Sequence, residues 1–157
     1  GELFRFQPTD IKKVIDEVYE NFANRMEEKN IRFSSEVKPG VIINGNAALL
    51  FSIFQNFVEN SINYAGPDIE ISIRIYHEDD KHYYFLYADT GAGIPKEHLP
   101  RIFERFYRVD HGRTREAGGT GLGLAIVKNA VQLHKGEISA RNRPKGGVEF
   151  LFSLAKK

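Results

Sequence analysis

Residues 69–89 read IEISIRIYHEDDKHYYFLYAD, and this stretch decides which kind of sheet the chain can form. Isoleucine recurs at every second position from Ile69 to Ile75, which gives a strand one apolar face. The acidic triplet at residues 78–80 predicts a tight turn, and the aromatic run at 83–88 predicts a second strand. The stretch therefore predicts an antiparallel hairpin.

The segments on both sides of this hairpin add helices and further strands. Asp10 and Asn46 are residue types that cap the N-terminus of a helix, and each is followed by apolar residues at helical spacing. The sequence predicts helices over residues 11–26, 46–64, 99–103 and 122–133, and strands over 31–37, 41–43, 137–142 and 148–154. Because tight turns such as residues 144–147 join the strands, we expect a mixed, largely antiparallel sheet with helices packed on one face. This fold class is an α/β (α+β) two-layer sandwich, and not a doubly wound Rossmann sheet.

Composition and charge narrow the functional classes. The chain has 157 residues with 22 basic and 21 acidic side chains, so a broad nucleic-acid-binding surface is not expected. It contains no cysteine, which excludes a disulfide scaffold, a thiol nucleophile and a cysteine-ligated zinc site. No apolar stretch approaches the roughly 18 residues that cross a bilayer. We expect a single domain over residues 1–157 that contacts neither nucleic acid nor membrane.

Three asparagines follow one side of the helix expected at residues 46–64. Asn56, Asn60 and Asn63 lie at i, i+4 and i+7, within an arc of roughly 60° on an α-helix. Asparagine is a poor residue for a helix interior, so three of them need a reason. An amide oxygen can fill one position on Mg²⁺ that phosphates and waters otherwise hold. A solvated polar face explains the stripe equally well.

An aspartate and two glycines directly follow the aromatic strand, in the run Asp89-Thr90-Gly91-Ala92-Gly93-Ile94-Pro95. A carboxylate at a strand end can accept a hydrogen bond from an exocyclic amine, and glycines let a planar ring approach the backbone. Adenine offers such an amine, whereas guanine has a carbonyl at that position. The alternative is a tight turn in which the aspartate caps its own backbone.

A glycine-rich segment at residues 118–124 directly precedes the last expected helix. Backbone N–H groups at a helix start, unobstructed by Cβ atoms, can bind a phosphate. The segment is not a P-loop, since no Gly-Lys-Ser/Thr ends it. It is not a Rossmann fingerprint either, since a charged loop precedes it in place of a strand. On its own, a glycine-rich turn is weak support for a nucleotide site.

Together and in this order, these motifs resemble the catalytic ATP-binding domain of sensor histidine kinases, in the gyrase/Hsp90/histidine-kinase/MutL superfamily. The matching residues are 54–65 for the N box, 89–94 for the G1 box, 102–110 for the F box, 119–123 for the G2 box and 146–150 for the last glycine box. The match extends from about Phe6 to Leu154. It implies the Bergerat ATP-binding fold, which agrees with the sandwich expected from the element order.

The resemblance implies ATP and Mg²⁺ as cofactors and gives the matching residues their roles. Asn60 would be the Mg²⁺ ligand, supported by Asn56, and Asp89 would bind the adenine amine. Residues 107–120 would form the ATP lid, from which Arg108 could reach the phosphates. The catalytic residues implied are Asn56, Asn60 and Arg108. The ATP-binding residues implied are Asn56, Asn60, Asn63, Tyr64, Asp89, Gly91, Gly93, Ile94, Tyr107, Arg108, Gly119, Thr120, Gly121, Leu122 and Gly123.

Two departures from the family's pattern bear on the chemistry. Gyrase-type ATPases carry a glutamate base four residues before the Mg²⁺ asparagine, where this chain has Asn56. The resemblance therefore favours phosphoryl transfer over hydrolysis. Asn63 stands where histidine kinases often carry a basic residue that contacts phosphate.

None of the histidines has the sequence context of a phosphoacceptor, so we expect ordinary surface residues at all of these positions. They are His77, His82, His98, His111 and His134. The resemblance places the acceptor histidine on a separate dimerisation domain, to which residues 1–9 would be the linker. It also implies a response regulator as the second partner.

The expected setting is the cytoplasmic portion of a membrane-bound bacterial sensor kinase, with the isolated domain monomeric. Two alternatives stay open within enzymes, an anti-sigma-type serine kinase and a superfamily ATPase. A degenerate module that binds partners without nucleotide is the third.

Overall fold

The hairpin expected from residues 69–89 forms the centre of a five-stranded sheet. In the computed structural model, which describes residues 4–107 and 123–157, the hairpin consists of β4 (Glu70–Glu78) and β5 (His82–Asp89). The two strands pair antiparallel from Ile71 opposite Asp89 to Glu78 opposite Tyr83. A register shift between Ile75 and His77 is the one irregularity in this pairing.

The remaining strands extend the sheet on both sides in the order β2-β4-β5-β7-β6. Their bounds are β2 (Arg32–Ser35), β6 (Ile138–Asn142) and β7 (Val148–Ala155). Only the β2–β4 pair of this sheet is parallel, so the sheet is mixed and largely antiparallel, as the sequence predicts. A second, two-stranded sheet joins β1 (Gln7–Asp10) to β3 (Ile42–Gly45).

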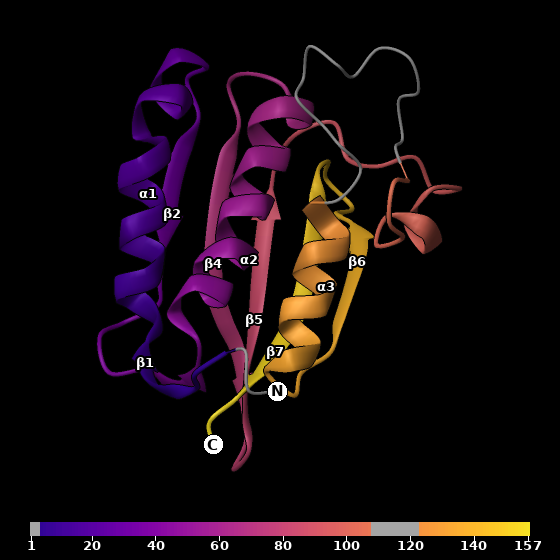
Figure 1. The fold of residues 1–157 in the computed structure, drawn as a ribbon. Helices are drawn as coiled ribbons and strands as arrows, with labels where there is room; N and C mark the ends of the chain where they lie inside the picture. The colour runs from indigo at the N-terminus through magenta and orange to yellow at the C-terminus, as the bar shows by residue number, and fades with distance from the viewer. Residues whose placement is uncertain (1–3, 108–122) are drawn as a thin grey trace.

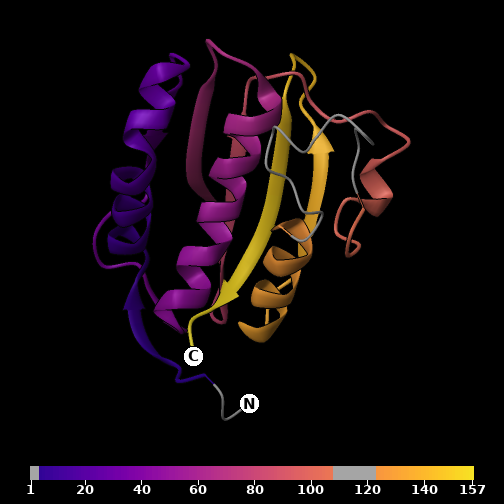
Figure 2. The same cartoon turned by 45° about the horizontal axis from the view of Figure 1, so that its top comes forward.

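Three helices form a layer on one face of the large sheet, and both views show this arrangement (Figures 1 and 2). They are α1 (Ile11–Glu28), α2 (Ala47–Asn60) and α3 (Gly123–Leu133). Asp10 caps α1 by accepting from the Lys12 N–H, and Asn46 caps α2 by accepting from the Leu49 N–H. The two-layer sandwich and both caps are thereby confirmed.

The end of α2 differs from the regular helix that the sequence predicts. The α-helix ends at Asn60, and a π-helical turn, η1 (Ser61–Ala65), follows it directly. The wider i→i+5 hydrogen bonding of η1 changes which residues share a face after Asn60.

The short helix predicted at residues 99–103 is a 3₁₀ helix, η2 (Leu99–Arg101).

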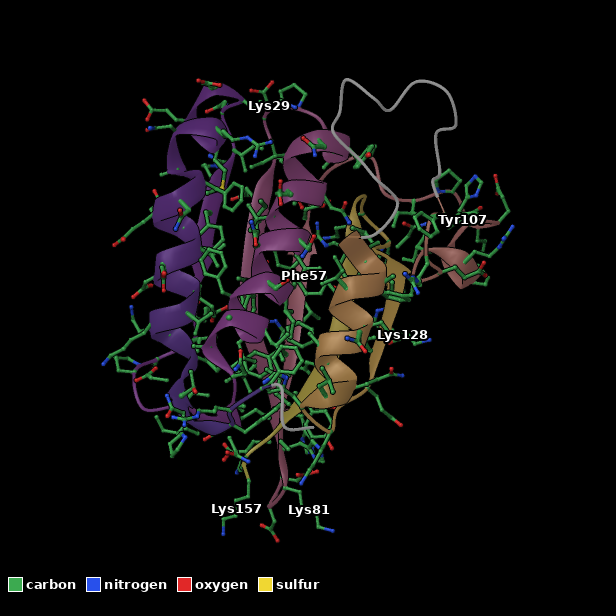
Figure 3. The ribbon with its side chains drawn as sticks, viewed as in Figure 1. Lys29, Phe57, Lys81, Tyr107, Lys128 and Lys157 are labelled. Carbon is green, nitrogen blue, oxygen red and sulfur yellow. The ribbon has the colours of Figure 1, made fainter. Side chains whose placement is uncertain are left out.

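Stacked aromatic rings join α2 to the sheet. Phe57 lies between α2 and the strands (Figure 3), with its ring centroid 4.9 Å from that of Tyr87 and 4.7 Å from that of Phe150. Phe85 stacks on Phe152 at 5.2 Å across the β5–β7 pair. Rings of this size bury large apolar areas and fix the orientation of α2 over β5 and β7.

The N-terminal segment is partly folded into the domain. Residues 7–9, expected as part of a linker, belong to β1, which pairs with β3 from Gln7 opposite Gly45 to Asp10 opposite Ile42. Asn46 also donates its side-chain N–H to the carbonyl of Arg5 at 3.0 Å. The chain entering the domain is therefore fixed at the start of α2.

His134 is buried, and its prediction as a surface histidine is wrong. The side chain is 1% exposed, with Nδ1 2.7 Å from the Ala130 carbonyl and Nε2 3.1 Å from the Asn46 nitrogen. Nδ1 therefore carries the proton, and Nε2 accepts the Asn46 N–H. Burial lowers the pKa of His134. Its spacing from the buried residues Val127 and Val131 is the signal that identifies its face.

We expect His134 to make the folded state sensitive to mild acid. Above its ordinary pKa of 6.5 the histidine is neutral in both states, so its contribution to stability is complete. Below pH 6.5 the unfolded chain takes up the proton first, and stability falls as the pH drops towards the lower pKa of the folded state. At pH 5.5, one unit below the ordinary pKa of 6.5, this loss is at most about 1.4 kcal/mol.

Urea unfolding at two pH values measures this effect. The variant His134→Gln should show a smaller loss between pH 7.5 and 5.5 than the parent chain, whereas a variant of the exposed His77, His77→Gln, should lose as much as the parent. Equal pH dependence in all three proteins would contradict the prediction.

Candidate nucleotide-binding site

Asp89 is a buried carboxylate with neutral hydrogen-bond donors. It ends β5 and is 3% exposed. One carboxylate oxygen accepts from the Gly91 N–H at 3.0 Å, and the other accepts from the Ser61 hydroxyl at 2.8 Å. No ion pair involves this carboxylate within residues 4–107 and 123–157. Two oxygens offer about four acceptor positions, so the group can accept further hydrogen bonds.

Ser61 and Tyr87 adjoin Asp89 in the candidate site, although no sequence motif indicates them. The Tyr87 hydroxyl lies 2.7 Å from the Ser61 hydroxyl and 3.1 Å from the Phe57 carbonyl oxygen. Burial raises the pKa of Tyr87 well above its ordinary value, so its hydroxyl keeps its proton. Alternation along β5 puts Tyr87 on the same face as Asp89, but no local pattern indicates its contact with Ser61.

Asn56 and Asn60 lie on the last turns of α2, at the end of the sheet where β5 also ends. Asn60 is partly buried, and its amide has no hydrogen-bond partner in the part of the chain that the structure describes. Asn56 donates to the Ser52 carbonyl at 2.7 Å. Its amide oxygen faces the start of α3, because a Cβ at Gly123 would lie 3.0 Å from it. The structure thus brings Asn56 next to the first residue of α3.

Asn63 has a different neighbour from the other two asparagines. Its amide oxygen accepts from the Arg25 guanidinium of α1 at 3.3 Å. The predicted arc of three asparagines assumes a regular α-helix, and the π-helical turn changes the direction of side chains after Asn60. Tyr64, in the same turn, is 43% exposed.

At Gly91, the turn after β5 packs against the end of the π-helical turn η1. The Ala92 N–H donates to the Ala65 carbonyl at 3.2 Å. A Cβ at Gly91 would lie 2.4 Å from the Ala65 Cβ, so only glycine allows this approach. The two sequence motifs that predict metal and adenine binding are therefore in direct contact.

Asn142, at the end of β6, holds the same turn from the other side. Its amide oxygen accepts from the Ile94 N–H at 2.9 Å, and its amide nitrogen donates to the Ile94 carbonyl at 2.6 Å. This pair of bonds fixes the backbone next to Gly93. No local sequence pattern indicates this role of Asn142, because the contact joins residues 48 positions apart.

The β6–β7 turn packs on the end of β5. A Cβ at Gly147 would lie 1.8 Å from the carbonyl oxygen of Asp89, and Gly147 has a φ of +93°. Arg143 donates to the Gly146 carbonyl at 3.1 Å and approaches the Asp89 carbonyl at 3.5 Å. The backbone that carries the Asp89 carboxylate is thus held by the close approach of Gly147 and by the Arg143 guanidinium of the same turn.

The predicted lid is described only at its first residue. Tyr107 bonds through its hydroxyl to Nδ1 of His98, and the Arg101 guanidinium lies 4.5 Å from its ring centroid. The predicted site residues that lie outside the described residues are Arg108, Gly119, Thr120, Gly121 and Leu122.

These groups fit a magnesium nucleotide chemically. The buried carboxylate of Asp89 has spare acceptor capacity for an amine, and the Asn60 amide has an oxygen for a metal ion. In the described part of the chain, acidic and histidine side chains form no cluster of three that could hold a metal ion. An ion at Asn60 would thus depend mainly on phosphate oxygens and water, as Mg²⁺ does in nucleotide sites.

Comparison with known proteins shows which protein family this chain belongs to. Residues 45–157 match the family model "Histidine kinase-, DNA gyrase B-, and HSP90-like ATPase", and the chain belongs to this family. It is 41% identical over 127 residues to the phosphate regulon sensor protein PhoR of Pseudomonas aeruginosa, covering 81% of this chain and 28% of PhoR. The chain therefore spans less than a third of the length of this relative.

Solved structures agree with this class. The mycobacterial sensor histidine kinase MprB superposes with a TM-score of 0.84 at 29% identity, covering 96% of this chain and 99% of that one. Histidine kinase ThkA in complex with response regulator protein TrrA has a TM-score of 0.78 at 25% identity, covering 97% and 42% of the two chains. The chain is an ATP-binding catalytic domain of the sensor histidine kinase type. Among residues 4–107 and 123–157, no helix is both long and apolar enough to cross a membrane.

We expect Gly147→Ala to destabilise the fold by roughly 2–4 kcal/mol, because the new Cβ meets the Asp89 carbonyl and a positive φ is strained. Gly40→Ala is the matched control, since Gly40 has a φ of +94° and nothing within 4 Å of the added Cβ. It should cost only about 1 kcal/mol. Urea unfolding measures both, and equal losses would show that the contact with Asp89 does not matter.

Proposed function

We propose that this domain binds Mg²⁺-ATP and transfers the γ-phosphoryl group to a histidine on a separate dimerisation domain. The observation that carries the proposal is the buried carboxylate of Asp89 with spare acceptor capacity at the end of β5. Asn60, at the end of α2 that adjoins Asp89 through Ser61, would supply the metal ligand.

Asp89 would select adenine by hydrogen-bond chemistry. Its carboxylate accepts only, so it can bind the adenine amine but not the guanine carbonyl. Gly91, Gly93 and Ile94, in the turn that follows, would line the base, and Asn142 holds this turn in place. The buried position strengthens the hydrogen bond relative to one in water.

Asn60 would hold Mg²⁺ together with the phosphate oxygens, and Asn56 would support the phosphates from the preceding turn. When bound, Mg²⁺ neutralises the charge that develops on the transferred phosphoryl group. The residues of this chain would act by positioning and by charge, without a covalent step on the domain itself.

The residues around Asn60 support transfer over hydrolysis. Asn56 cannot take a proton from water, and the one acidic residue beside Asn60 in sequence, Glu59, lies 3.8 Å from the Arg25 guanidinium of α1. The Asn56 amide has no basic group for a proton, and the Glu59 carboxylate is paired with a cation of another helix. The γ-phosphoryl group would therefore be transferred to a nucleophile from another domain, and not to water.

The expected partners are the histidine-bearing dimerisation domain and a response regulator. The ThkA–TrrA complex is a precedent for the second partner in a structural relative. The setting we propose is the cytoplasmic side of a membrane-bound sensor, with this domain monomeric when isolated. The other site residues stay predictions, namely Asn63, Tyr64, Tyr107, Arg108, Gly119, Thr120, Gly121, Leu122 and Gly123.

Asp89→Asn should weaken ATP binding roughly 10–100-fold, the usual effect of losing a charged hydrogen-bond acceptor. If the Gly91 N–H keeps the amide oxygen, the amide nitrogen replaces the oxygen that accepts from Ser61, so the side chain offers donors in place of acceptor positions for the adenine amine. Calorimetric titration with ATP, ADP and GTP, with and without Mg²⁺, measures this. Equal binding of ATP and GTP by the parent chain, or no binding at millimolar concentration, would overturn the proposed function.

Asn60→Ala should abolish the Mg²⁺ dependence of ATP binding and reduce phosphoryl transfer at least tenfold. Transfer is measured with γ-labelled ATP and the dimerisation segment of the same parent protein, as acid-labile phosphohistidine. The control Asn21→Ala removes an exposed amide of α1 that donates to the Glu17 carbonyl. If Asn60→Ala leaves the Mg²⁺ dependence unchanged, Asn60 is not the metal ligand.

A further inference from the structure

We propose that Ser61 and Tyr87 are positioning residues that fix the Asp89 carboxylate as the acceptor for the adenine amine, and so determine base selectivity. This inference rests on the proposed function. Neither side chain needs to touch the nucleotide, because both act through Asp89.

The hydrogen bonds among these three residues have a defined direction. An ionised carboxylate only accepts, so the Ser61 hydroxyl must donate its one proton to Asp89, at 2.8 Å. Ser61 can then only accept from Tyr87, at 2.7 Å. Tyr87 shares its proton between the Ser61 oxygen and the Phe57 carbonyl, at 3.1 Å. The chain thus runs from Tyr87 through Ser61 to Asp89.

Burial makes this chain energetically important. Tyr87, Ser61 and Asp89 are 0%, 2% and 3% exposed. A buried carboxylate without a donor loses its hydration without replacement, and in the described residues Asp89 has only two neutral donors and no ion pair. Losing the Ser61 donor frees one oxygen to rotate or to take up water.

The backbone around Ser61 explains why it reaches Asp89. Ser61 begins the π-helical turn η1, and its own N–H bonds to the carbonyls of Phe57 and Val58. The Phe57 carbonyl also accepts from Tyr87, while the Phe57 ring stacks on the Tyr87 ring at 4.9 Å. Tyr87 therefore holds the end of α2 and orients the Ser61 hydroxyl at once.

The consequence is specific to the 6-position of the purine. An amine at that position donates to Asp89, a carbonyl is rejected, and a bare C–H gives no hydrogen bond. If Ser61 acts through Asp89, removing its hydroxyl weakens only a ligand that carries the amine. If Ser61 merely stabilises the fold, every purine triphosphate weakens alike.

The test compares the dissociation constants of ATP and purine riboside triphosphate, which lacks the 6-amine. We expect the parent chain to prefer ATP at least tenfold. Ser61→Ala should weaken ATP binding about three- to tenfold and change purine riboside triphosphate less than twofold, so the preference shrinks. Tyr87→Phe should reduce the preference by a smaller factor, because Ser61 still donates.

Two control variants separate the outcomes, with thermal unfolding measured on each. Ser153→Ala removes another buried serine hydroxyl, on β7, that accepts from the Glu137 N–H at 3.0 Å. This variant should leave the preference for ATP unchanged. Asp89→Asn should abolish it. If Asp89→Asn abolishes the preference while Ser61→Ala keeps it, the inference is wrong and the proposed function stands. If the parent chain shows no preference for ATP, the adenine assignment itself fails, and the inference with it.

Discussion

The contact between Ser61 at the end of α2 and Asp89 at the end of β5 is the constraint on which the site depends. It joins the helix that carries Asn56 and Asn60 to the strand that carries Asp89, the proposed acceptor for the adenine amine. Because both groups are nearly inaccessible to water, the carboxylate is stable only where donors such as Ser61 and the Gly91 N–H meet it. The position of α2 over the sheet therefore sets the distance between Asn60, the proposed metal ligand, and Asp89, the proposed base-binding group.

The aromatic layer supplies the rigidity that this contact requires. Phe57 of α2 stacks on Tyr87 of β5 and on Phe150 of β7, so the helix cannot slide along the sheet without separating these rings. Two glycines then let the surrounding turns approach the end of β5 and the end of η1 closely. Gly147 packs against the Asp89 backbone, and Gly91 against Ala65, at distances that no side chain would allow. Ring stacking and close backbone contact thus fix the position of Asp89 relative to α2.

Local signals were enough to predict most of the fold and part of the site. The alternation at residues 69–89 predicts the central hairpin, and Asp10 and Asn46 predict the starts of two helices, because strands and caps depend on neighbouring residues. The contacts of Ser61, Tyr87 and Asn142 join distant residues, and no local pattern contains them. The π-helical turn that directs Asn63 towards Arg25 could not be predicted either, because a sequence pattern with a period of 3.6 residues assumes a regular α-helix.

The start of α2 connects the site to the chain that enters the domain. Asn46 caps the helix, donates its side-chain N–H to the Arg5 carbonyl, and gives its backbone N–H to the buried His134 at the end of α3. The same helix ends in Asn60 and contacts Asp89 through Ser61. One helix therefore connects the incoming segment, at its start, with the proposed metal ligand, at its end. Because Asn56 cannot take a proton and the Glu59 carboxylate pairs with the Arg25 guanidinium, the acceptor in the proposed reaction is a nucleophile from outside this domain and not a water activated by this helix.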